Sequence, residues 1–442
     1  MTIQHSAGST KPTLDLAGLG IGPFNLSIAA LLTEIPECNA QFFDQKSGFN
    51  WHPGMLLPGV RLQTSYLKDL VTGVSPTNQY SFLNFLVKHR RFYQFLSAEL
   101  SAISRKEYAA YLTWVSQQLP NLSFNQGIES VEFNDNQFLL TLSNGEQQAA
   151  KNLCLGTGKQ PYVPDCAKPH LSSQCFHAIG IALKDLDLTG KKVAIIGGGQ
   201  TGAEILETIL DRRWGEPTDV HWLSRRQNFE PLDETPFTNE YFTPQYVDTF
   251  YHQPDRVKDR VMHSQKLASD GISPDTLKSL YRKLYEYNID SGVGFNLHMR
   301  PNREMFAMEK QGGSHRINAL NGLTQQVETT FADVVILCTG FEFNLPSYLE
   351  PIKDKLNLDE KGRYRLQRDF HVEWDGPESN RIYAVNAGRH SHGIAEPQMS
   401  LMCWRSATII NDLLGTEAFD ISQSMNMVEW ATPHTASLEL AM

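Results

Sequence analysis

Two glycine-rich turns constrain the fold of this 442-residue chain more than any other feature. In each, a short apolar run precedes closely spaced glycines and an apolar stretch of helical length: LDLAGLGIGPFNLSIAALL from residue 14 and KKVAIIGGGQTGAEILETIL from residue 191. A strand, a tight turn and a helix in this order bring a helix N-terminus against a pyrophosphate, which the glycine backbone can approach closely. The sequence therefore predicts an α/β fold with two Rossmann-like dinucleotide-binding units.

The first turn is followed by a strand with an acidic end. It carries Gly18, Gly20 and Gly22, and Pro23 stands where the usual GxGxxG fingerprint has another glycine. The next apolar run, AQFFDQK, reaches Asp44 at the distance expected of an acid that hydrogen-bonds an adenosine ribose hydroxyl. We therefore expect FAD at this unit; the alternative is an ordinary βαβ unit with a glycine turn.

The second turn is followed by a strand with a basic end. Gly197, Gly199 and Gly202 stand in full GxGxxG register, and the next apolar run, DVHWLSRR, ends in Arg225 and Arg226 without an acid. A guanidinium accommodates the 2′-phosphate of NADPH where a carboxylate would repel it. We expect NADPH at this unit; the alternative is that the two arginines belong to a solvated loop.

Composition excludes several classes of protein. Apolar residues make up 41% of the chain and charged residues 20%, as in folded soluble proteins. The formal charge of −10 argues against a nucleic-acid partner, and the apolar runs are far shorter than the ~20 residues that span a membrane. Six scattered cysteines without CxxC spacing, and a first stretch without an apolar core, predict a cytoplasmic protein with free thiols.

Two apolar runs that end in Gly-Thr-Gly or Thr-Gly indicate the order of the domains. They are NLCLGTGKQPYVP from residue 152 and DVVILCTGFEF from residue 333, and such strands mark passages between domains in flavoproteins with two dinucleotides. We therefore expect an NADPH domain inserted into a discontinuous FAD domain. The predicted organisation is a disordered tail over 1–12, the FAD-binding domain over 13–170, the NADPH-binding domain over 171–340 with a small, mainly helical substrate region over about 235–290, and the FAD-domain return with a C-terminal helix over 341–442.

A loop rich in proline, glycine and aromatic residues follows the first unit. This loop, FNWHPGMLLPGVRLQTSYLKDLV from residue 49, can cover the flavin ring, and Gln63 and Lys68 are its candidate polar contacts. His52 in the same loop is also a candidate site residue. The alternative is that it is a loop histidine whose hydrogen bonds are satisfied. In the helical region, Asn239 is a further candidate.

Two later segments predict helices beside candidate site residues. SDGISPDTLKSLYRKLYEY predicts a turn and a helix, so Ser269 and Asp270 are either site residues or caps of the turn. HGIAEPQMSLMCWRSATIINDLLG predicts a helix that starts at Ser400, facing flavin or substrate, and stops at Gly415. An earlier segment, SRKEYAAYLTWVSQQL, starts with the spacing of a capping box.

A metal centre is not expected from the sequence. His390 and His392 form the pattern HSH, which could invite a metal interpretation. No third ligand stands at a recognisable spacing from them.

Together these motifs resemble the siderophore-pathway amine N-hydroxylases: flavin-dependent L-lysine N6-monooxygenases, L-ornithine N5-monooxygenases, and diamine or histamine N-hydroxylases. The resemblance spans nearly the whole chain, and its GPFNL and LKDLV blocks are more distinctive than the glycine turns. The residues that carry it are GLGIGPFNLSIAAL (18–31), FNWHPGM (49–55), LQTSYLKDLV (62–71), GTGKQPYVP (156–164), GGGQTGAE (197–204), TNEYFTP (238–244) and HGIAEPQMSLMCWRSA (392–407).

The motifs and the resemblance together define the predicted sites. For FAD they are Gly18, Gly20, Gly22, Pro23, Asn25, Asp44, Trp51, His52 and Gln63. For NADPH they are Gly197, Gly199, Gly202, Arg225 and Arg226, with Arg225 at the 2′-phosphate. For the substrate they are Lys68, Asn239, Ser269, Asp270 and Ser400. The resemblance also implies a homo-oligomer, in relatives a tetramer.

The resemblance implies a reaction that needs no strong acid or base from the protein. NADPH reduces FAD, the reduced flavin takes up O₂ as a C4a-hydroperoxyflavin, and a neutral amine attacks the distal oxygen. Because a primary amine has a pKa of about 10.4, the pocket must favour its neutral form. The protein orients the reactants and excludes water.

The sequence favours L-lysine as the substrate, with putrescine, cadaverine and histamine as alternatives. Ornithine hydroxylases carry an Asn in a TNYS-like segment, whereas this chain has ASDGI with Ser269 at that position. A disulfide reductase is disfavoured because Cys38 has no partner cysteine near the first helix, and a Baeyer–Villiger-type monooxygenase because QCFHAIG does not fit the FxGxxxHxxxW/Y block. A sensor that binds FAD and NADP without turnover remains the non-enzyme alternative.

Overall fold

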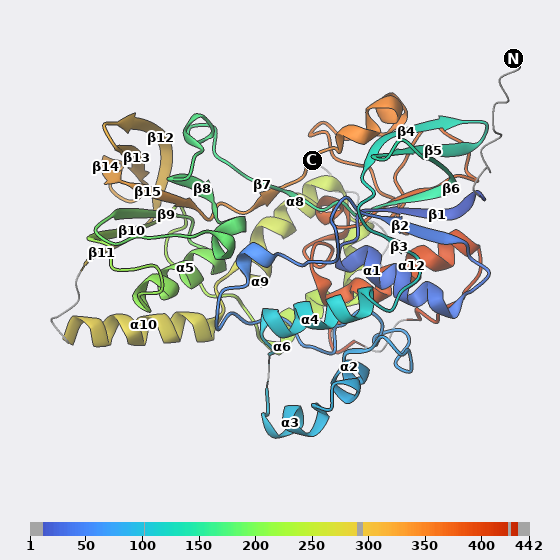
Figure 1. Ribbon diagram of the computed structural model, residues 1–442, viewed down its shortest axis with the longest axis horizontal. Coiled ribbons are helices and arrows are strands. Elements are labelled where there is room, and N and C mark those ends of the chain that lie inside the picture. The colour runs from blue at the N-terminus through green and yellow to red at the C-terminus, as the bar shows by residue number, and fades with distance from the viewer. Residues whose placement is uncertain (1–11, 101, 290–294, 423–425, 432–442) are drawn as a thin grey trace, which may run out of the picture.

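The computed structural model describes residues 12–100, 102–289, 295–422 and 426–431, so most of the expected disordered tail lies outside the described residues. Two sheets, each covered by helices, form two lobes (Figure 1). In the first lobe the strand order is β3-β2-β1-β6-β5-β4. Strand β17 pairs with the last residues of β6, and β5 pairs with the first ones. These strands are β1 (Leu14–Leu19), β2 (Ala40–Phe43), β3 (Leu122–Ser123), β4 (Ile128–Asn134), β5 (Gln137–Leu142), β6 (Gln147–Leu155) and β17 (Ile382–Ala384).

The first sheet is parallel at its centre and packs helices on one face. β1 pairs in parallel with β2 and β6, whereas β4, β5 and β6 are antiparallel. Leu16 and Phe42 point to a core shared with α1 (Pro23–Leu31), α4 (Arg105–Ser116) and α12 (Met402–Leu414). Ala17 and Phe43 point to the opposite core, which a 3-10 helix over Ser347–Lys355 covers.

The second sheet is wholly parallel and has the order β11-β10-β9-β15-β8. Helices α5 and α10 cover one of its faces, and a three-stranded antiparallel sheet, β12-β13-β14, covers the other. The elements are β8 (Cys175–His177), β9 (Lys192–Ile196), α5 (Gln200–Leu210), β10 (Asp219–Ser224), α10 (Pro274–Ile289), β11 (Asn296–Pro301), β12 (Arg303–Gln311), β13 (Ser314–Asn321), β14 (Val327–Ala332) and β15 (Val334–Leu337).

The chain crosses between the two sheets at the segments where the sequence has Gly-Thr-Gly and Thr-Gly. The outward crossing contains β7 (Gln160–Pro161) and the return contains β16 (Phe341–Glu342). These two strands pair with each other in antiparallel fashion. Both connections between the lobes therefore run through one two-stranded ribbon (Figure 1).

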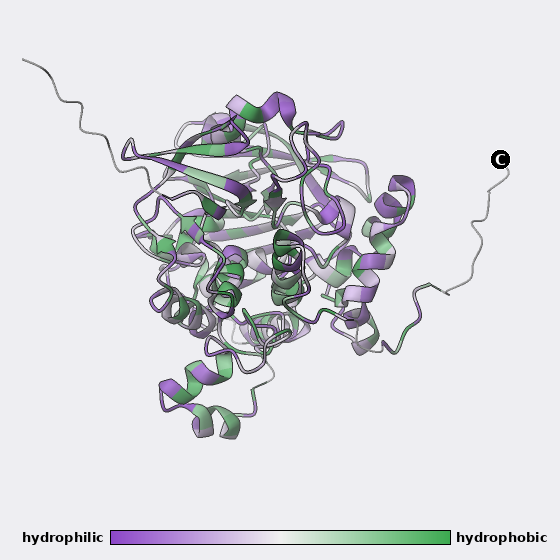
Figure 2. Ribbon diagram, turned by 90° about the vertical axis from the view of Figure 1, so that its right-hand side faces the viewer, coloured by the Kyte–Doolittle hydropathy of each residue, from purple (hydrophilic) through white to green (hydrophobic). Residues whose placement is uncertain are grey.

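Short helices fill the space between the lobes and project from the first one. The first group is α6 (Pro236–Asn239), α7 (Pro244–Tyr251), α8 (Asp255–Ser264), α9 (Lys266–Asp270) and α11 (Arg389–His392). The projecting helices are α2 (Phe82–Lys88) and α3 (Phe92–Ser97), and hydrophobic and hydrophilic residues alternate along them (Figure 2). No described helix has both the length and the apolar character that a membrane crossing needs.

The predicted helix ends are confirmed in two places, and one differs in detail. Ser104 caps α4 by accepting a hydrogen bond from the backbone N–H of Glu107 at 3.1 Å, and Gly415 ends α12 in the left-handed region with φ +63°. The carboxylate of Glu107 pairs with Arg91 instead of closing the capping box. Because the guanidinium of Arg91 is within reach, the Glu107 carboxylate pairs with it and not with the backbone N–H of Ser104.

Helix α10 packs one side against the second lobe and lines the cleft with another. We expected it to share a substrate-facing layer with the 233–246 segment. Its apolar residues Leu277, Leu280 and Leu284 join the core beneath α5, because their spacing places them on one face of the helix. The polar residues Asp275, Thr276, Ser279 and Lys283 of the same helix line the cleft that also holds the substrate candidates.

Candidate functional site

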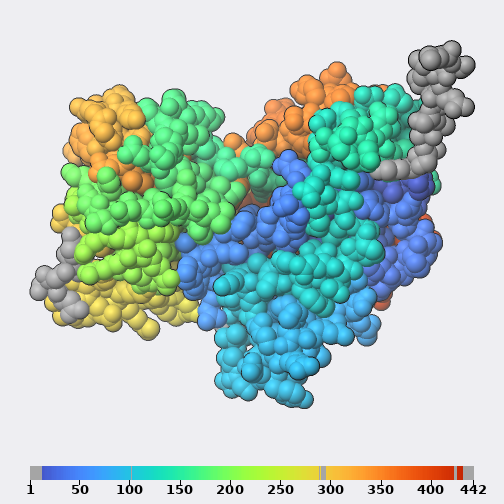
Figure 3. Space-filling model, viewed as in Figure 1, coloured from blue at the N-terminus to red at the C-terminus, as the bar shows by residue number. Residues whose placement is uncertain are grey.

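A cleft of about 2400 Å³ lies between the two lobes and is lined by residues of both. Figure 3 shows a notch between the lobes in the space-filling view. The cleft brings together most of the predicted site residues, which come from segments far apart in the sequence. Those that line it are Gly20, Gly22, Pro23, Asp44, Trp51, His52, Gln63, Lys68, Asn239, Ser269, Asp270 and Ser400.

The first glycine turn fits the close approach of a phosphate. Gly20 has φ +89°, and a Cβ on it would lie 2.8 Å from the carbonyl oxygen of Gly156. Gly22 is the N-cap of α1 and has no side chain to cap the helix. The free N–H groups at this helix end therefore face the cleft, as a pyrophosphate site requires.

Asn25 supports this turn from behind and does not line the cleft. Its side chain is fully buried, and its Nδ2 donates to the carbonyl oxygens of Gly20 at 2.8 Å and Cys154 at 3.3 Å. Its Oδ1 accepts from the thiol of Cys154 at 3.1 Å. We infer that Asn25 holds the backbone of the turn rather than a cofactor atom. Gly18 is likewise behind the turn, where a Cβ would lie 2.0 Å from the ring of Phe42.

Asp44 lies directly after β2 and at the edge of the cleft. Its Oδ2 accepts from the backbone N–H of Ile21 at 2.8 Å, and its Oδ1 accepts from that of Lys46 at 2.9 Å. The ammonium of Lys46 lies 3.3 Å from the same carboxylate. Asp44 therefore ties strand β2 to the glycine turn, and its contact with a ribose stays a prediction.

The loop after β2 covers the wall of the cleft with aromatic rings. Trp51 packs edge-on against Tyr108 of α4, with ring centroids 5.5 Å apart. His52 has a left-handed backbone with φ +45°, and burial followed by the positive charge of Arg105 lowers its pKa. A neutral imidazole is thereby favoured beside the expected flavin position.

The second glycine turn packs against the return strand. Gly197 has φ +130°, and a Cβ on it would lie 2.1 Å from the carbonyl oxygen of Cys338. A Cβ on Gly202 would lie 2.3 Å from the carbonyl oxygen of Gly197, so this glycine lets α5 begin close to the turn. Gly199 caps α5 without a side chain, and the next residue, Gln200, lines the cleft. This cradle also fits a pyrophosphate.

Three cations gather beyond the end of β10. Arg225 is exposed, and the Nη1 of Arg226 is buried with no hydrogen-bond partner among the described residues. Burial, and then the charges of Arg226 and Arg225, lower the pKa of Lys266 on α9. Neither arginine belongs to the lining of the cleft itself. A cluster of cations with an unsatisfied hydrogen-bond donor is suited to binding a phosphate. The sequence did not indicate that Lys266 belongs to this cluster.

Lys68 reaches the cleft from the loop of the first lobe. Its Nζ lies 5.9 Å from the centroid of the Phe242 ring. Burial alone lowers the pKa of its ammonium, and no acidic residue in the described part of the chain opposes that effect. A partly desolvated cation without a counter-charge is prepared to bind an anionic group.

Asp270 lines the cleft, but its charge is already compensated. Arg389 donates from Nη2 to the carboxylate of Asp270 at 3.0 Å and to the hydroxyl of Ser269 at 3.2 Å. Lys159 also lines the cleft, and its pKa responds to the charges of both Arg389 and Asp270. Arg389 thus compensates the charge of Asp270 directly. The sequence did not indicate Arg389 because its partner, Asp270, is 119 residues away along the chain.

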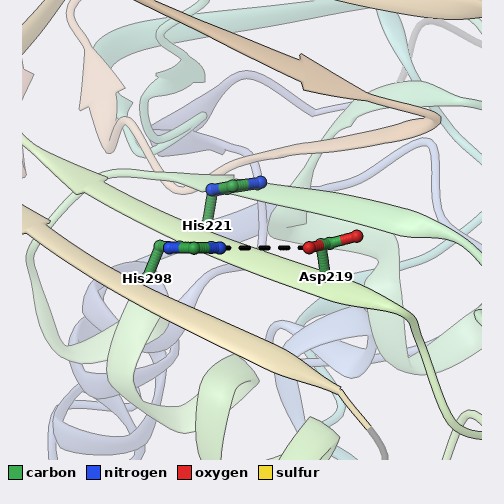
Figure 4. A group of neighbouring side chains, drawn as sticks. All are labelled: Asp219, His221 and His298. Atoms are coloured by element: carbon green, nitrogen blue, oxygen red, sulfur yellow. Dashed lines mark ion pairs between the residues drawn. The ribbon is translucent and has the colours of Figure 1, made fainter.

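Two groups of side chains bring donor atoms within 4.8 Å of one another in the described residues: Asp219, His221 and His298, and Asp369, His371 and Asp412. In the first, the two rings stack with centroids 4.4 Å apart and an interplanar angle of 9° (Figure 4). Lone pairs in parallel planes do not converge on one ion. Burial, and then Arg300 and His298, lower the pKa of His221 to about 4. The geometry and the nearby guanidinium both disfavour a bound cation.

The histidine side chains of the second group and of the HSH pair already make hydrogen bonds. Arg381 lies 3.0 Å from the Nε2 of His371, whose Nδ1 contacts Asp369. His390 and His392 belong to neither group, and their Nε2 atoms lie 2.9 Å and 3.3 Å from backbone carbonyl oxygens. The hydrogen bonds of these imidazoles therefore stabilise the fold.

Comparison with known proteins identifies the family. The profile of the L-lysine 6-monooxygenase/L-ornithine 5-monooxygenase family matches residues 12–343. The chain belongs to this family.

Relatives in this family differ in the amine they are named for. The chain is 43% identical to the L-lysine N6-monooxygenase of Escherichia coli over 95% of this chain and 99% of that protein. It is 33% identical to the putrescine N-hydroxylase of Acinetobacter baumannii, over 94% and 93% of the two chains. The crystal structure of the FAD-bound cadaverine monooxygenase of the desferrioxamine pathway from Erwinia amylovora superimposes with a TM-score of 0.90 at 29% identity, covering 96% of this chain and 100% of that one.

A first prediction concerns Asp44 and flavin retention. Replacing Asp44 by Ala removes both its backbone contacts and any ribose contact, so the purified Asp44→Ala protein is expected to hold much less flavin. The ratio of flavin to protein absorbance measures this. Asp15→Ala, on β1 and outside the cleft lining, is the matched control and should retain flavin. Full occupancy in Asp44→Ala would show that Asp44 only ties β2 to the glycine turn and does not hold the flavin.

A second prediction concerns acid stability. Burial lowers the pKa of His392 to about 3, so between there and the unfolded value of about 6.5 the unfolded chain binds the extra proton. Stability attributable to this group therefore falls as the pH drops, by up to about 1.4 kcal/mol per pH unit. His392→Gln should lose less stability than the parent between pH 7 and pH 5 in urea unfolding. An equal loss in both proteins would mean that His392 is not the group that titrates.

Proposed function

We propose that this chain N-hydroxylates the terminal amine of L-lysine in the biosynthesis of a hydroxamate siderophore. Its family makes it a flavin-dependent N-hydroxylating monooxygenase that uses FAD, NADPH and O₂. The choice of amine is the part that the proposal adds. It rests on the charges at the substrate end of the cleft.

The observation that carries the proposal is the pairing of Asp270 with Arg389. An amino-acid substrate has a carboxylate at the end remote from its reacting amine, and a diamine has a second ammonium there. A free Asp270 would attract that ammonium, but its carboxylate is engaged at 3.0 Å by Arg389. Within the part of the chain that the structure describes, no acid opposes Lys68, so its ammonium repels a second ammonium and attracts a carboxylate. These charges support L-lysine.

The protein's part in the reaction is to hold and orient. The first glycine turn and Asp44 are placed to bind FAD, and the second turn with Arg225, Arg226 and Lys266 to bind NADPH. Bound flavin, reduced by NADPH, supplies the oxygen-activating chemistry. The burial that lowers the pKa of Lys68 also favours the neutral form of a substrate amine that enters the same cleft.

A diamine is the second candidate, and Asp270 is the observation that favours it. If Arg389 released this carboxylate, an ammonium could take its place. Putrescine and cadaverine enzymes among the relatives make this alternative specific. Histamine is the remaining alternative from the family resemblance.

We also propose that the enzyme acts in the cytoplasm as a homo-oligomer. The exposed apolar side chains of Val87, Tyr93 and Leu96 on α2 and α3 are a candidate contact between copies. Light scattering of the holoenzyme measures the assembly.

Product analysis by mass tests the proposed substrate. The holoenzyme is incubated with NADPH and O₂ and, in turn, L-lysine, putrescine, cadaverine and histamine. L-lysine is expected to gain one oxygen with the highest kcat/KM. NADPH oxidation without any hydroxylated amine would favour a nucleotide-binding protein without turnover of these amines.

A third prediction concerns coenzyme preference. Arg225→Ala should lower the NADPH/NADH ratio of kcat/KM, because loss of a charged phosphate partner costs roughly 1.5–3 kcal/mol. The same ratio is measured for Arg226→Ala and Lys266→Ala to rank the three cations. An unchanged ratio in Arg225→Ala would remove Arg225 from the phosphate site.

A fourth prediction concerns Lys68. Lys68→Ala should raise the KM for L-lysine at least about tenfold, because a carboxylate loses a charged partner in a partly desolvated site. Any turnover of cadaverine, which has no carboxylate, should change much less. If instead the parent enzyme prefers a diamine or histamine with far higher kcat/KM, Lys68 does not select a carboxylate.

A further inference from the structure

A buried ion pair joins the two lobes across the cleft. Arg105, the first residue of α4, donates from Nη1 and Nη2 to the two carboxylate oxygens of Glu204 on α5, at 3.1 Å and 2.8 Å. The side chains are only 16% and 5% exposed. We infer that this pair is a positioning device for hydride transfer, because it holds the nucleotide-binding helix of one lobe at a fixed place against the flavin-binding lobe. The inference rests on the proposed placement of the two dinucleotides.

Glu204 lies on the face of α5 that lines the cleft, opposite the face that packs into the second lobe. Its neighbours Ala203, Ile205 and Leu206 on α5 are buried in the core of the second lobe. Burial raises the pKa of Glu204, and Arg105 opposes that rise. A carboxylate that is only 5% exposed needs a close partner with good geometry, and Arg105 of the other lobe provides it. The pair therefore bridges the cleft at a point where neither side chain contributes to a core.

The carboxylate also belongs to a hydrogen-bond network that begins at the glycine turn. Gln200, the first residue of α5, donates to Glu204 at 2.8 Å and to the hydroxyl of Thr276 at 3.1 Å. Its side-chain oxygen accepts from the backbone N–H of Ser273 at 2.8 Å. Gln63, from the loop of the first lobe, donates to the hydroxyl of Ser273 at 3.1 Å. The start of α5, the start of α10 and the flavin-side loop are thus bound together.

Apolar packing also joins the lobes, since Leu57 and Val60 of the first lobe's loop lie in a core of the second, but the covalent ribbon does not itself hold the start of α5 against the first lobe. Both crossings run through the ribbon of β7 and β16, which pairs two residues with two. A ribbon of this length can twist, whereas hydride transfer between dinucleotides held in different lobes requires their alignment to within about 1 Å. A bidentate contact between a guanidinium and a carboxylate fixes direction as well as distance. Arg105 and Glu204 supply that restraint at the helix that receives the nucleotide.

The test is a double-variant analysis of flavin reduction by NADPH without oxygen, measured by stopped flow on the holoenzyme. Arg105→Ala and Glu204→Ala should each lower the limiting rate at saturating NADPH at least about tenfold, as misalignment does, while the dissociation constant for NADPH changes little. The double variant should be no slower than the slower single variant, because both changes remove the same contact. Small-angle scattering should show a larger radius of gyration in all three.

A neighbouring ion pair provides the control. Arg91 pairs with Glu107 on the same helix α4, but this pair lies within the first lobe. Arg91→Ala should leave both the limiting rate and the radius of gyration unchanged. If the alanine variant of Arg105 or of Glu204 fails to retain FAD, Arg105→Lys and Glu204→Gln test the same ion pair with smaller changes in volume and should also slow flavin reduction.

Four results would contradict the inference or the function on which it rests. Unchanged limiting rates in both single variants would leave the pair a structural contact only. If the limiting rate falls in Arg105→Ala but is normal in Glu204→Ala, Arg105 acts on a cofactor rather than through Glu204. The same conclusion follows if the two rate losses multiply in the double variant. If the unmodified holoenzyme itself is not reduced by NADPH, the proposed function fails first.

Discussion

The fold depends on two close approaches of backbone to backbone that glycine alone permits. Gly20 lies against Gly156, just after β6, and Gly197 lies against Cys338, just after β15. In each lobe the strand that supports the glycine turn is also the strand from which the chain leaves for the other lobe. The nucleotide cradle and the connection between lobes are therefore built from the same few residues. A side chain at either glycine would displace both.

Electrostatic pairing then decides what the cleft can hold. An acid in the cleft attracts an ammonium only if its charge is free, and Asp270 is held by Arg389. Lys68 has no such partner among the described residues. At the proposed substrate end of the cleft, what matters is therefore which charged residues are already paired as well as which are present. The same principle explains how the nearly buried carboxylate of Glu204 is accommodated in the wall of the cleft.

Local patterns in the sequence predict much of the framework correctly. The glycine turns, the cap at Ser104 and the stop at Gly415 depend on residues close together in the chain, so short-range spacing carries the information. The crossings at the Gly-Thr-Gly and Thr-Gly segments follow from the same local logic. The predicted residues of the first turn separate in the structure into those that line the cleft and those, such as Asn25, that support it from behind.

Pairings between distant segments are not accessible from such patterns. Arg389 meets Asp270 and Arg105 meets Glu204 only because the chain returns to the same cleft after long intervals. Helix α10 has an amphipathic pattern that fits several neighbours, and the core beneath α5 determines which one it meets. Lys266 joins the arginines beyond β10 for the same reason.

The most direct test of the account is a comparison of L-lysine with L-lysinamide, which keeps the reacting amine and the chain length but lacks the carboxylate charge. The account predicts that kcat/KM for hydroxylation falls at least about tenfold with the amide, because Lys68 loses an anionic partner. Equal kcat/KM for the two compounds would contradict the claim that unpaired positive charge in the cleft selects the substrate.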